Sequence, residues 1–407
     1  MPQTSDRRPA ALKFPDGRTP RIALALQGGG ALGAYQVGVY QALEEAGVTP
    51  DWVAGISIGA VNAALIVGNK PEQRLERLTE FWQTISRPDL MPLPAQIDLR
   101  RFYNATSANQ TMLFGQPGFF KPRLLNPWFA PAGTPGAVSF YDTAPLADTL
   151  ARLIDFDQLN SGATRLTLGA ANVETGEQIT FDTAYSRIGP EHIMASGALP
   201  PGFPPVQAGV DLCWDGGVVS NAPVSMVLDD QPRQDTLCFM VDLFDPVGPV
   251  PRTMSDVLDR QKEIAYASRN RHHIESFRAT HDLRRAVNAL AARLPKSALE
   301  DPEIRRLAEL GCVTTMNIVH LLYRSRKYET GSKDYEFSRA SIAEHRAIGY
   351  RDTCMALTHR PWFRSVDVNT GVVIHDVVSH EGEEAVISKP AAAHPAAGRK
   401  PRRVSGD

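Results

Sequence analysis

The sequence predicts an α/β protein in which a mainly parallel sheet is flanked by helices. Residues 21–69 run twice through the order strand, glycine turn and helix: RIALAL, GGGALG and AYQVGVYQALEEAG precede DWVAGIS and IGAVNAALIVGN. Both strand segments are apolar and uncharged after their first residue, as expected for strands buried on both faces of a parallel sheet. The composition, 43% hydrophobic and 22% charged over 407 residues, supplies a large core.

The N-terminal half is expected to consist of a polar leader and most of a core domain. Residues 1–20 contain prolines and charges and no apolar signal-peptide run, so we predict a disordered N-terminus and a cytoplasmic protein. The core domain is expected over 21–248. Within it, residues 86–145 are rich in Pro, Phe and small residues. This insertion either packs on the body or serves as a lid or lipid-facing surface.

The remaining strands of the core domain are expected further along the chain. Residues 164–183 have the pattern of a hairpin that turns at 174–176, and 191–206 read as a short helix entering a proline-rich turn. A strand running into a glycine turn follows at 210–224, and a buried strand at 236–245.

Beyond about residue 250 the composition becomes more charged and more helical. We predict a mainly helical C-terminal extension over 249–385 and a disordered basic tail over 386–407.

Several function classes are disfavoured by composition. The net charge of −2 provides no basic field for nucleic acid. The four cysteines, Cys213, Cys238, Cys312 and Cys354, form no C-x-x-C pair and are expected to be reduced core thiols, so no metal site is predicted. Residues 22–43 and 52–69 are uncharged and near the length of a membrane span, but the glycines and asparagines within them favour strand, turn and buried helix.

Two glycine-containing motifs are candidates for the functional site, and they predict different functions. Gly28, Gly30 and Gly33 fit the G-x-G-x-x-G of a dinucleotide-binding loop. However, the acidic residue that follows, Asp51, precedes the second strand, whereas a nucleotide-binding unit places it at that strand's end. The second motif, Gly55-Ile-Ser-Ile-Gly59, is a G-x-S-x-G, which places Ser57 on the tight strand-to-helix turn of a nucleophile elbow.

The two motifs are compatible if the glycine loop binds an oxyanion. The backbone N–H groups of Gly28, Gly29 and Gly30 open a helix with little steric cover, and such a loop can hold a negatively charged oxygen. The loop then complements the serine, and no nucleotide is required.

The general base has two candidate arrangements. A Ser-Asp-His triad would use Asp242 with His272, His273 or His320, but the first two histidines lie in a charged helical stretch. A Ser-Asp dyad would use Asp215, which ends an apolar strand and is followed by Gly216 and Gly217.

Taken together, these motifs resemble those of the patatin-like phospholipase family. The shared elements are the glycine loop 28–33, GISIG at 55–59, ASGALPPGFPPV at 195–206 and WDGGVVSNAPV at 214–224. The resemblance implies a fold related to cytosolic phospholipase A2, a Ser57–Asp215 dyad with a DGG motif, and an oxyanion hole at Gly28 to Gly30. It implies no metal and no organic cofactor. Residues 334–352 resemble an extension of some bacterial members.

The function expected from this resemblance is hydrolysis of carboxylic esters of lipids through an acyl-enzyme. Phospholipid, lysophospholipid, acylglycerol, polyhydroxyalkanoate and short-chain esters remain open as substrates. Peripheral contact with a membrane or granule surface is compatible with all of them, and the oligomeric state is not predicted. The alternative is a non-catalytic lipid- or granule-surface binding protein on the same fold.

Overall fold

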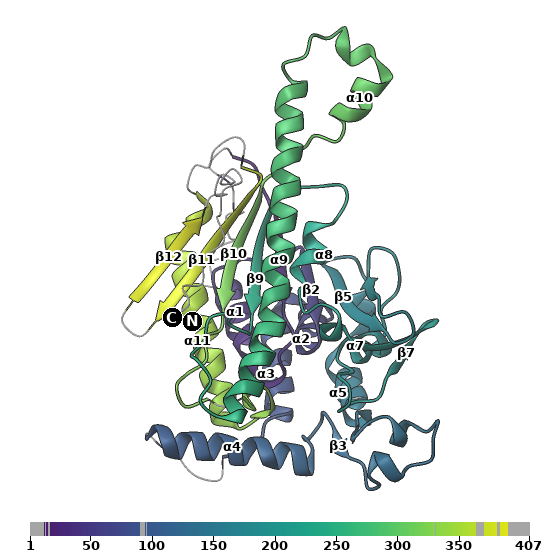
Figure 1. Cartoon of the computed structure of the whole chain (residues 1–407), viewed down its shortest axis with the longest axis vertical. Helices are drawn as coiled ribbons and strands as arrows, with labels where there is room; N and C mark the ends of the chain where they lie inside the picture. Colours follow the sequence, from purple (N-terminus) through teal and green to yellow (C-terminus); the bar gives the residue numbers. More distant parts are fainter. Residues whose placement is uncertain are drawn as a thin grey trace, which may run out of the picture.

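The computed structural model describes residues 17–89, 96–329, 331–363, 370–380 and 383–389, together with Leu12, Phe14 and Pro94 (Figure 1). Its centre is a ten-stranded sheet in the order β12-β11-β10-β9-β1-β2-β5-β8-β7, with β6 paired to β5.

Parallel strands make up the middle of this sheet. These strands are β1 (Arg21–Leu26), β2 (Trp52–Ile56), β5 (Arg165–Asn172), β9 (Thr236–Asp242), β10 (Met316–Leu322) and β11 (Val372–His380). The antiparallel strands are β6 (Gln178–Asp182), β7 (Val206–Ala208), β8 (Asp211–Asp215) and β12 (Glu383–Lys389). The predicted α/β class with a mainly parallel sheet is therefore confirmed, as is the hairpin at 164–183.

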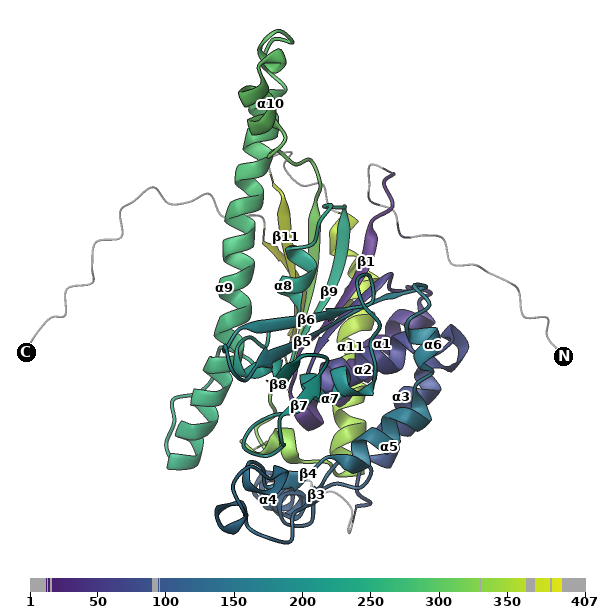
Figure 2. The ribbon, with the colours of Figure 1, turned by 90° about the vertical axis from the view of Figure 1, so that its right-hand side faces the viewer.

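Helices cover both faces of the sheet, because alternate residues of each strand point to opposite sides. Leu24 and Leu26 of β1 pack in one core with the helices α1 (Ala34–Glu45), α2 (Ile58–Val67), α3 (Arg74–Thr84) and α11 (Arg339–His359). Ala23 and Ala25 pack in a second core with α8 (Val224–Leu228) and α9 (Met254–Ala291). Figure 2 shows α9 on the opposite side of the sheet from α1 and α2.

The two uncharged stretches at 22–43 and 52–69 are strand, turn and buried helix, as predicted. Within the described part of the chain, no helix combines the length and apolarity needed to cross a bilayer.

The C-terminal segment is more closely joined to the sheet than its composition indicated. Residues 249–385 contain α9, α10 (Pro302–Ala308) and α11, but they also supply β10, β11 and part of β12. The far end of α9, with α10, projects beyond the sheet (Figures 1 and 2). The domain boundaries themselves stay a prediction.

Both predicted disordered ends fall largely outside the described residues. Of residues 1–20, Phe14 is buried in the core, and 17–20 lead into β1. Of residues 386–407, the first four belong to β12, so the predicted tail begins too early. Val386 and Ile387 are strand formers, but the Pro-, Ala- and Arg-rich composition of the rest of the tail concealed this short strand.

The insertion 86–145 forms one end of the molecule, at the bottom of Figures 1 and 2. It holds α4 (Ile97–Phe114) and a small ribbon of β3 (Lys121–Pro122) and β4 (Tyr141–Asp142). The remaining helices of this part of the chain are α5 (Ala144–Leu153), α6 (Phe156–Leu159) and α7 (Pro190–Ser196).

Candidate active site

Ser57 lies on a strained turn between β2 and α2. Its φ of 57° and ψ of −127° put a non-glycine residue in the positive-φ region. Arg360 is the only other non-glycine residue with a positive φ among the described residues. The turn needs glycine on both sides. A Cβ on Gly59 would lie 2.1 Å from the Leu26 carbonyl oxygen, and one on Gly55 would lie 2.4 Å from the Gly59 carbonyl oxygen. The predicted elbow geometry is present.

Asp215 ends β8, and Ser57 follows β2. These two strands are separated in the sheet by β5 alone. The carboxylate is 2% exposed, its Oδ1 accepts a hydrogen bond from the Gly217 amide at 2.7 Å, and it lines the same pocket as Ser57. Burial raises the pKa of Asp215 to about 6, although the Ser57 and Gly217 hydrogen bonds act to lower it. The two residues of the predicted dyad therefore lie in the same pocket, near enough for Ser57 to affect the pKa of Asp215.

Gly216 and Gly217 support this arrangement in different ways. A Cβ on Gly216 would lie 2.6 Å from the Gly169 carbonyl oxygen of β5, so this position cannot carry a side chain without moving the backbone. Gly217 provides the amide that holds the Asp215 carboxylate. The strand end and the glycine turn thus fix where the carboxylate points.

The glycine loop differs from the prediction at Gly28. Its N–H donates to Asn221 Oδ1 at 2.8 Å, and Asn221 Nδ2 donates back to the Gly28 carbonyl oxygen at 3.0 Å. The Gly28 amide is therefore engaged and is not available to an oxyanion. Within the described part of the chain the Gly29 and Gly30 N–H groups have no hydrogen-bond partner. The candidate oxyanion hole is reduced to those two amides.

A buried polar network holds the glycine loop from behind. Gln27 Nε2 donates to the Asn221 carbonyl oxygen at 3.1 Å, and Gln36 Nε2 donates to the Gln27 carbonyl oxygen. Asn62 Nδ2 donates to the Gln36 side chain at 2.8 Å and to the Gly33 carbonyl oxygen at 3.0 Å. Such satisfied buried networks fix one backbone arrangement. Sequence reasoning quoted Asn221 within WDGGVVSNAPV but gave it no role.

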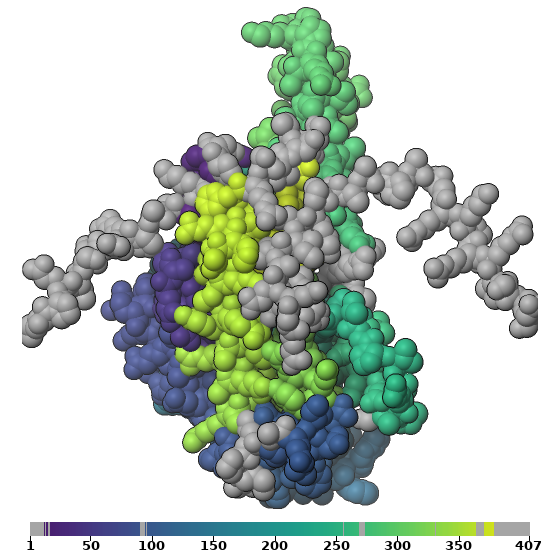
Figure 3. Space-filling view, turned by 90° about the vertical axis from the view of Figure 1, so that its left-hand side faces the viewer, coloured from purple at the N-terminus to yellow at the C-terminus, as the bar shows by residue number. Residues whose placement is uncertain are grey.

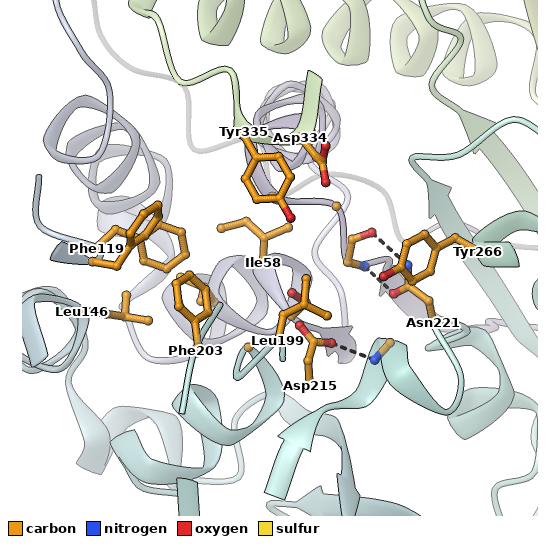
Figure 4. A pocket seen from close by; sticks show the side chains of 18 of the residues that line it. Ile58, Phe119, Leu146, Leu199, Phe203, Asp215, Asn221, Tyr266, Asp334 and Tyr335 are labelled. Carbon is orange, nitrogen blue, oxygen red and sulfur yellow. Dashed lines mark hydrogen bonds between the residues drawn. The ribbon is translucent and has the colours of Figure 1, made fainter. Parts of the chain in front are cut away.

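A small pocket opens beside Ser57 and Asp215. Its free volume is about 80 Å³. Phe119, Leu146 and Phe203 lie together on one side of it, whereas Asn221 and Tyr266 lie on the other (Figure 4). The pocket thus joins an apolar half to a polar half that holds the dyad, as suits an ester with a hydrocarbon chain.

Two distant segments of the chain complete this pocket. Phe119 and Phe120 come from the insertion, and Asp334, Tyr335 and Phe337 come from the loop before α11. A Cβ on Gly30 would lie 2.2 Å from the Asp334 carbonyl oxygen, so this loop sits directly on the glycine loop. Sequence reasoning missed these residues. Their spacing carries no signal, because only the fold brings them together.

The alternative triad is not assembled at Ser57. His320 Nε2 lies 3.0 Å from Asp242, and its Nδ1 lies 2.9 Å from Asp376, but this cluster lines a separate cavity. His273 contacts Ser220 at 3.4 Å, and the side chain of His272 lies outside the described residues. No histidine among the described side chains lines the Ser57 pocket.

The dinucleotide alternative also lacks its acidic residue. The Asp51 carboxylate accepts from the Ile22 amide at 2.8 Å, at the start of β1. The glycine loop lies at the other end of that strand, so Asp51 is a local partner of the backbone and cannot reach a ligand on the loop. In the part of the chain that the structure describes, no group of three or more His, Cys, Asp or Glu side chains is arranged to hold a metal ion.

Comparison with known proteins points to one family over most of the chain. A family model described as patatin-like phospholipase matches residues 24–228, about half of the chain. A second, described as patatin phospholipase, matches residues 264–369.

Individual relatives match over shorter stretches. An uncharacterised NTE family protein of Mycobacterium bovis is 36% identical over 85 residues, 21% of this chain and 22% of that protein. A lysophospholipase of Aspergillus terreus is 59% identical over 44 residues, 11% of this chain and 3% of that protein. The human patatin-like phospholipase domain-containing protein 6 is 46% identical over 61 residues, 15% of this chain and 4% of that protein. The chain thus spans only a small part of these relatives.

Among solved structures, VipD from Legionella pneumophila has a TM-score of 0.37 and 13% identity, over 88% of this chain and 72% of that one. The type III effector ExoU has a TM-score of 0.27 and 15% identity, over 84% of this chain and 53% of that one.

Proposed function

The chain belongs to the patatin-like phospholipase family, and from this premise we propose that it hydrolyses carboxylic esters of lipids with Ser57 as nucleophile and Asp215 as general base. The observation that carries the proposal is that a serine on a strained elbow and a buried carboxylate line the same pocket. Burial raises the pKa of this carboxylate to about 6. At neutral pH most of that carboxylate is ionised and can accept a proton.

The acylation step follows from the positions of these groups. The Ser57 hydroxyl oxygen attacks the ester carbonyl carbon, and its proton passes to Asp215. The carbonyl oxygen becomes an oxyanion, which the Gly29 and Gly30 amides stabilise by hydrogen bonds. As the intermediate collapses, protonated Asp215 gives its proton to the leaving alcohol, and the acyl group remains on Ser57.

Deacylation reverses the roles with water in place of the alcohol. Asp215 takes a proton from water, the resulting hydroxide attacks the acyl carbonyl, and the same amides hold the oxyanion. Collapse expels Ser57, which recovers its proton from Asp215, and releases the carboxylic acid. The α2 N-terminus, which starts at Ile58, adds a favourable dipole for negative charge at this point.

The apolar half of the pocket supports an acyl chain as the part of the substrate bound there. Phe119, Leu146 and Phe203 provide hydrocarbon contacts next to the nucleophile. The head group is not identified by these contacts, so phospholipid, lysophospholipid, acylglycerol and polyester stay as candidates within the proposed class.

The test is hydrolysis of p-nitrophenyl esters of graded chain length. We expect Ser57→Ala and Asp215→Asn each to lower kcat at least about 100-fold. Ser186→Ala and Asp211→Asn, which change the same residue types outside the pocket, serve as matched controls and are expected to keep activity. Labelling by a fluorophosphonate probe that requires Ser57 excludes the non-catalytic alternative. Full hydrolysis by Ser57→Ala would refute the proposal.

A further inference from the structure

The insertion exposes an unusually apolar surface at one end of the molecule. Among the described residues, Phe102, Leu113 and Phe114 of α4 are each more than two-thirds exposed. Leu124, Trp128 and Phe129 of the following loop are 108%, 83% and 78% exposed. These six side chains are here called the apolar end. α4 and β3 lie together at the bottom of Figures 1 and 2, and α4 again occupies the lower end of the space-filling view in Figure 3.

Charge is nearly absent from this surface. Residues 124–141 contain no Asp, Glu, Lys or Arg, although most of them are exposed or half-buried. The charged residues among the 18 of α4 are Asp98, Arg100 and Arg101. Arg100 is buried and forms an ion pair with Glu344. An exposed helix in water normally carries its charges on the outer face. In α4 the exposed charges, Asp98 and Arg101, lie in its first turns, and its exposed C-terminal end carries Met112, Leu113 and Phe114.

The apolar end is continuous with the candidate active site. Phe119 and Phe120 lie between α4 and β3 and line the pocket. The Phe120 ring lies 4.8 Å from that of Tyr141, and the Tyr141 hydroxyl donates to the Met112 carbonyl oxygen at the end of α4. The ring contact of Phe120 with Tyr141 thus joins the packing of the apolar end to the wall of the pocket.

We propose that the apolar end inserts into the interfacial layer of a phospholipid bilayer and places the pocket opening against the lipid. This inference rests on the proposed function, since it names where the substrate is taken up. An amphipathic helix and neighbouring aromatic side chains enter such an interface by about 5–10 Å. A second copy of the chain on this surface would instead cover the side of the molecule next to the pocket-lining Phe119 and Phe120.

Binding driven by apolar burial has a specific signature. Because residues 124–141 are uncharged, attraction to the bilayer depends weakly on salt and does not require anionic lipid. Two basic residues flank the segment: Lys121 is paired with Asp142 at 3.2 Å, and Arg123 Nε donates to Ser139 Oγ at 3.1 Å.

The experiment measures flotation of the full-length Ser57→Ala protein with phosphatidylcholine vesicles, so that no lipid is consumed. Trp128 is the reporter: of the other four tryptophans, Trp52, Trp82 and Trp362 are at most 3% exposed and Trp214 is half-buried. Vesicles with brominated acyl chains quench a tryptophan that enters them, and the quenching that Trp128→Ser removes is that of Trp128. We expect quenching at both low and high salt. Trp128→Ser with Phe129→Ser should weaken vesicle binding at least about 10-fold, or 1.4 kcal/mol.

Matched controls separate docking from folding and from chemistry. Leu283→Ser with Leu290→Ser changes two side chains of similar exposure on the projecting part of α9 and should leave vesicle binding unchanged. In an otherwise wild-type chain, Trp128→Ser with Phe129→Ser should keep hydrolysis of a soluble p-nitrophenyl ester while losing hydrolysis of vesicle lipid.

The outcomes distinguish this inference from the proposed function. Absence of Trp128 quenching with Ser57-dependent ester hydrolysis intact overturns the docking surface alone. Ester hydrolysis that survives Ser57→Ala overturns the proposed function, whereas vesicle quenching in that case still supports the surface. A dimer in light scattering that the Trp128 and Phe129 substitutions dissociate, without vesicle binding by either form, identifies a second copy as the occupant and overturns the proposal.

Discussion

The Asn221 side chain binds both backbone polar groups of Gly28: its Oδ1 accepts from the Gly28 N–H at 2.8 Å, and its Nδ2 donates to the Gly28 carbonyl oxygen at 3.0 Å. Asn221 follows the Asp-Gly-Gly turn by only a few residues, so one short segment carries both the carboxylate and the clamp on the glycine loop. The relative position of base and candidate oxyanion hole is thereby fixed by a single stretch of chain.

This clamp predicts that Asn221→Ala lowers kcat by about 10- to 100-fold with little change in KM. Loss of both hydrogen bonds lets the Gly29 and Gly30 amides drift from the oxyanion, and one lost oxyanion contact costs about 10²–10³ in kcat. Steady-state kinetics on a p-nitrophenyl ester measures the split. Asn172→Ala, in the β5–β6 turn, is the matched control. Unchanged kcat in Asn221→Ala would show that the clamp does not position the loop.

The elbow predicts a strict requirement for glycine at position 59. A Cβ there would lie 2.1 Å from the Leu26 carbonyl oxygen, so Gly59→Ala must displace either β1 or α2. We expect a loss of more than about 3 kcal/mol in unfolding free energy, or insoluble protein. Gly136→Ala is the control, because its nearest neighbouring atom is 3.8 Å away. Chemical denaturation compares them, and equal stability of the two variants would contradict the crowded turn.

The raised pKa of Asp215 predicts the acidic limb of the pH–rate profile. A general base must be ionised, so kcat/KM should fall as pH drops through about 6, the value to which burial raises this pKa. An exposed aspartate would place the limb near 4. The measurement is kcat/KM for a neutral ester from pH 4 to 8, within the range in which the protein stays folded. A limb near 4 would mean that Asp215 is hydrated in solution.

His320 predicts a stability change at alkaline pH. Burial disfavours the charged ring, but hydrogen bonds and charges from Asp242 and Asp376 outweigh it and raise the pKa of His320 to about 9. The folded pKa lies above the unfolded one, so the stabilisation is complete below about pH 6.5 and is lost as pH rises through about 9.

The measurement is unfolding free energy at pH 6 and at pH 9.5. We expect wild type to lose stability between them and His320→Gln to be about 3 kcal/mol less stable than wild type at pH 6, because the buried Asp242 and the half-buried Asp376 then lose their cation. The difference between variant and wild type should shrink at pH 9.5. His359→Gln, on a helix end, is the control. A constant difference at both pH values would contradict the charged histidine.

Local sequence was enough for the first half of the fold. The apolar runs at 21–26 and 52–56 and the glycines after them predicted two strand-turn-helix units, because strand and helix periodicities are properties of neighbouring residues. The later strands β10 and β11 were not predicted. Their residues were assigned to a helical extension, because charged helical segments on both sides dominate the composition there.

The candidate site divides in the same way. Ser57 and Asp215 could be proposed from motifs, since an elbow and a strand-end carboxylate each have a short sequence signature. The Asn221 contact with Gly28 could not, because it joins residues nearly two hundred positions apart and depends on how the strand ends are packed.

The sequence by itself thus determined the α/β class, the elbow serine and the aspartate that meets it. Only the tertiary structure decided which amides of the glycine loop stay unengaged and that Phe119, Phe203 and Tyr335 share one pocket. It also decided that His320 pairs with Asp242 of β9 and Asp376 of β11 and not with Ser57. The physical reason is that backbone conformation is set by nearby residues, whereas hydrogen-bond partners and pocket walls are set by which distant segments the sheet order brings together.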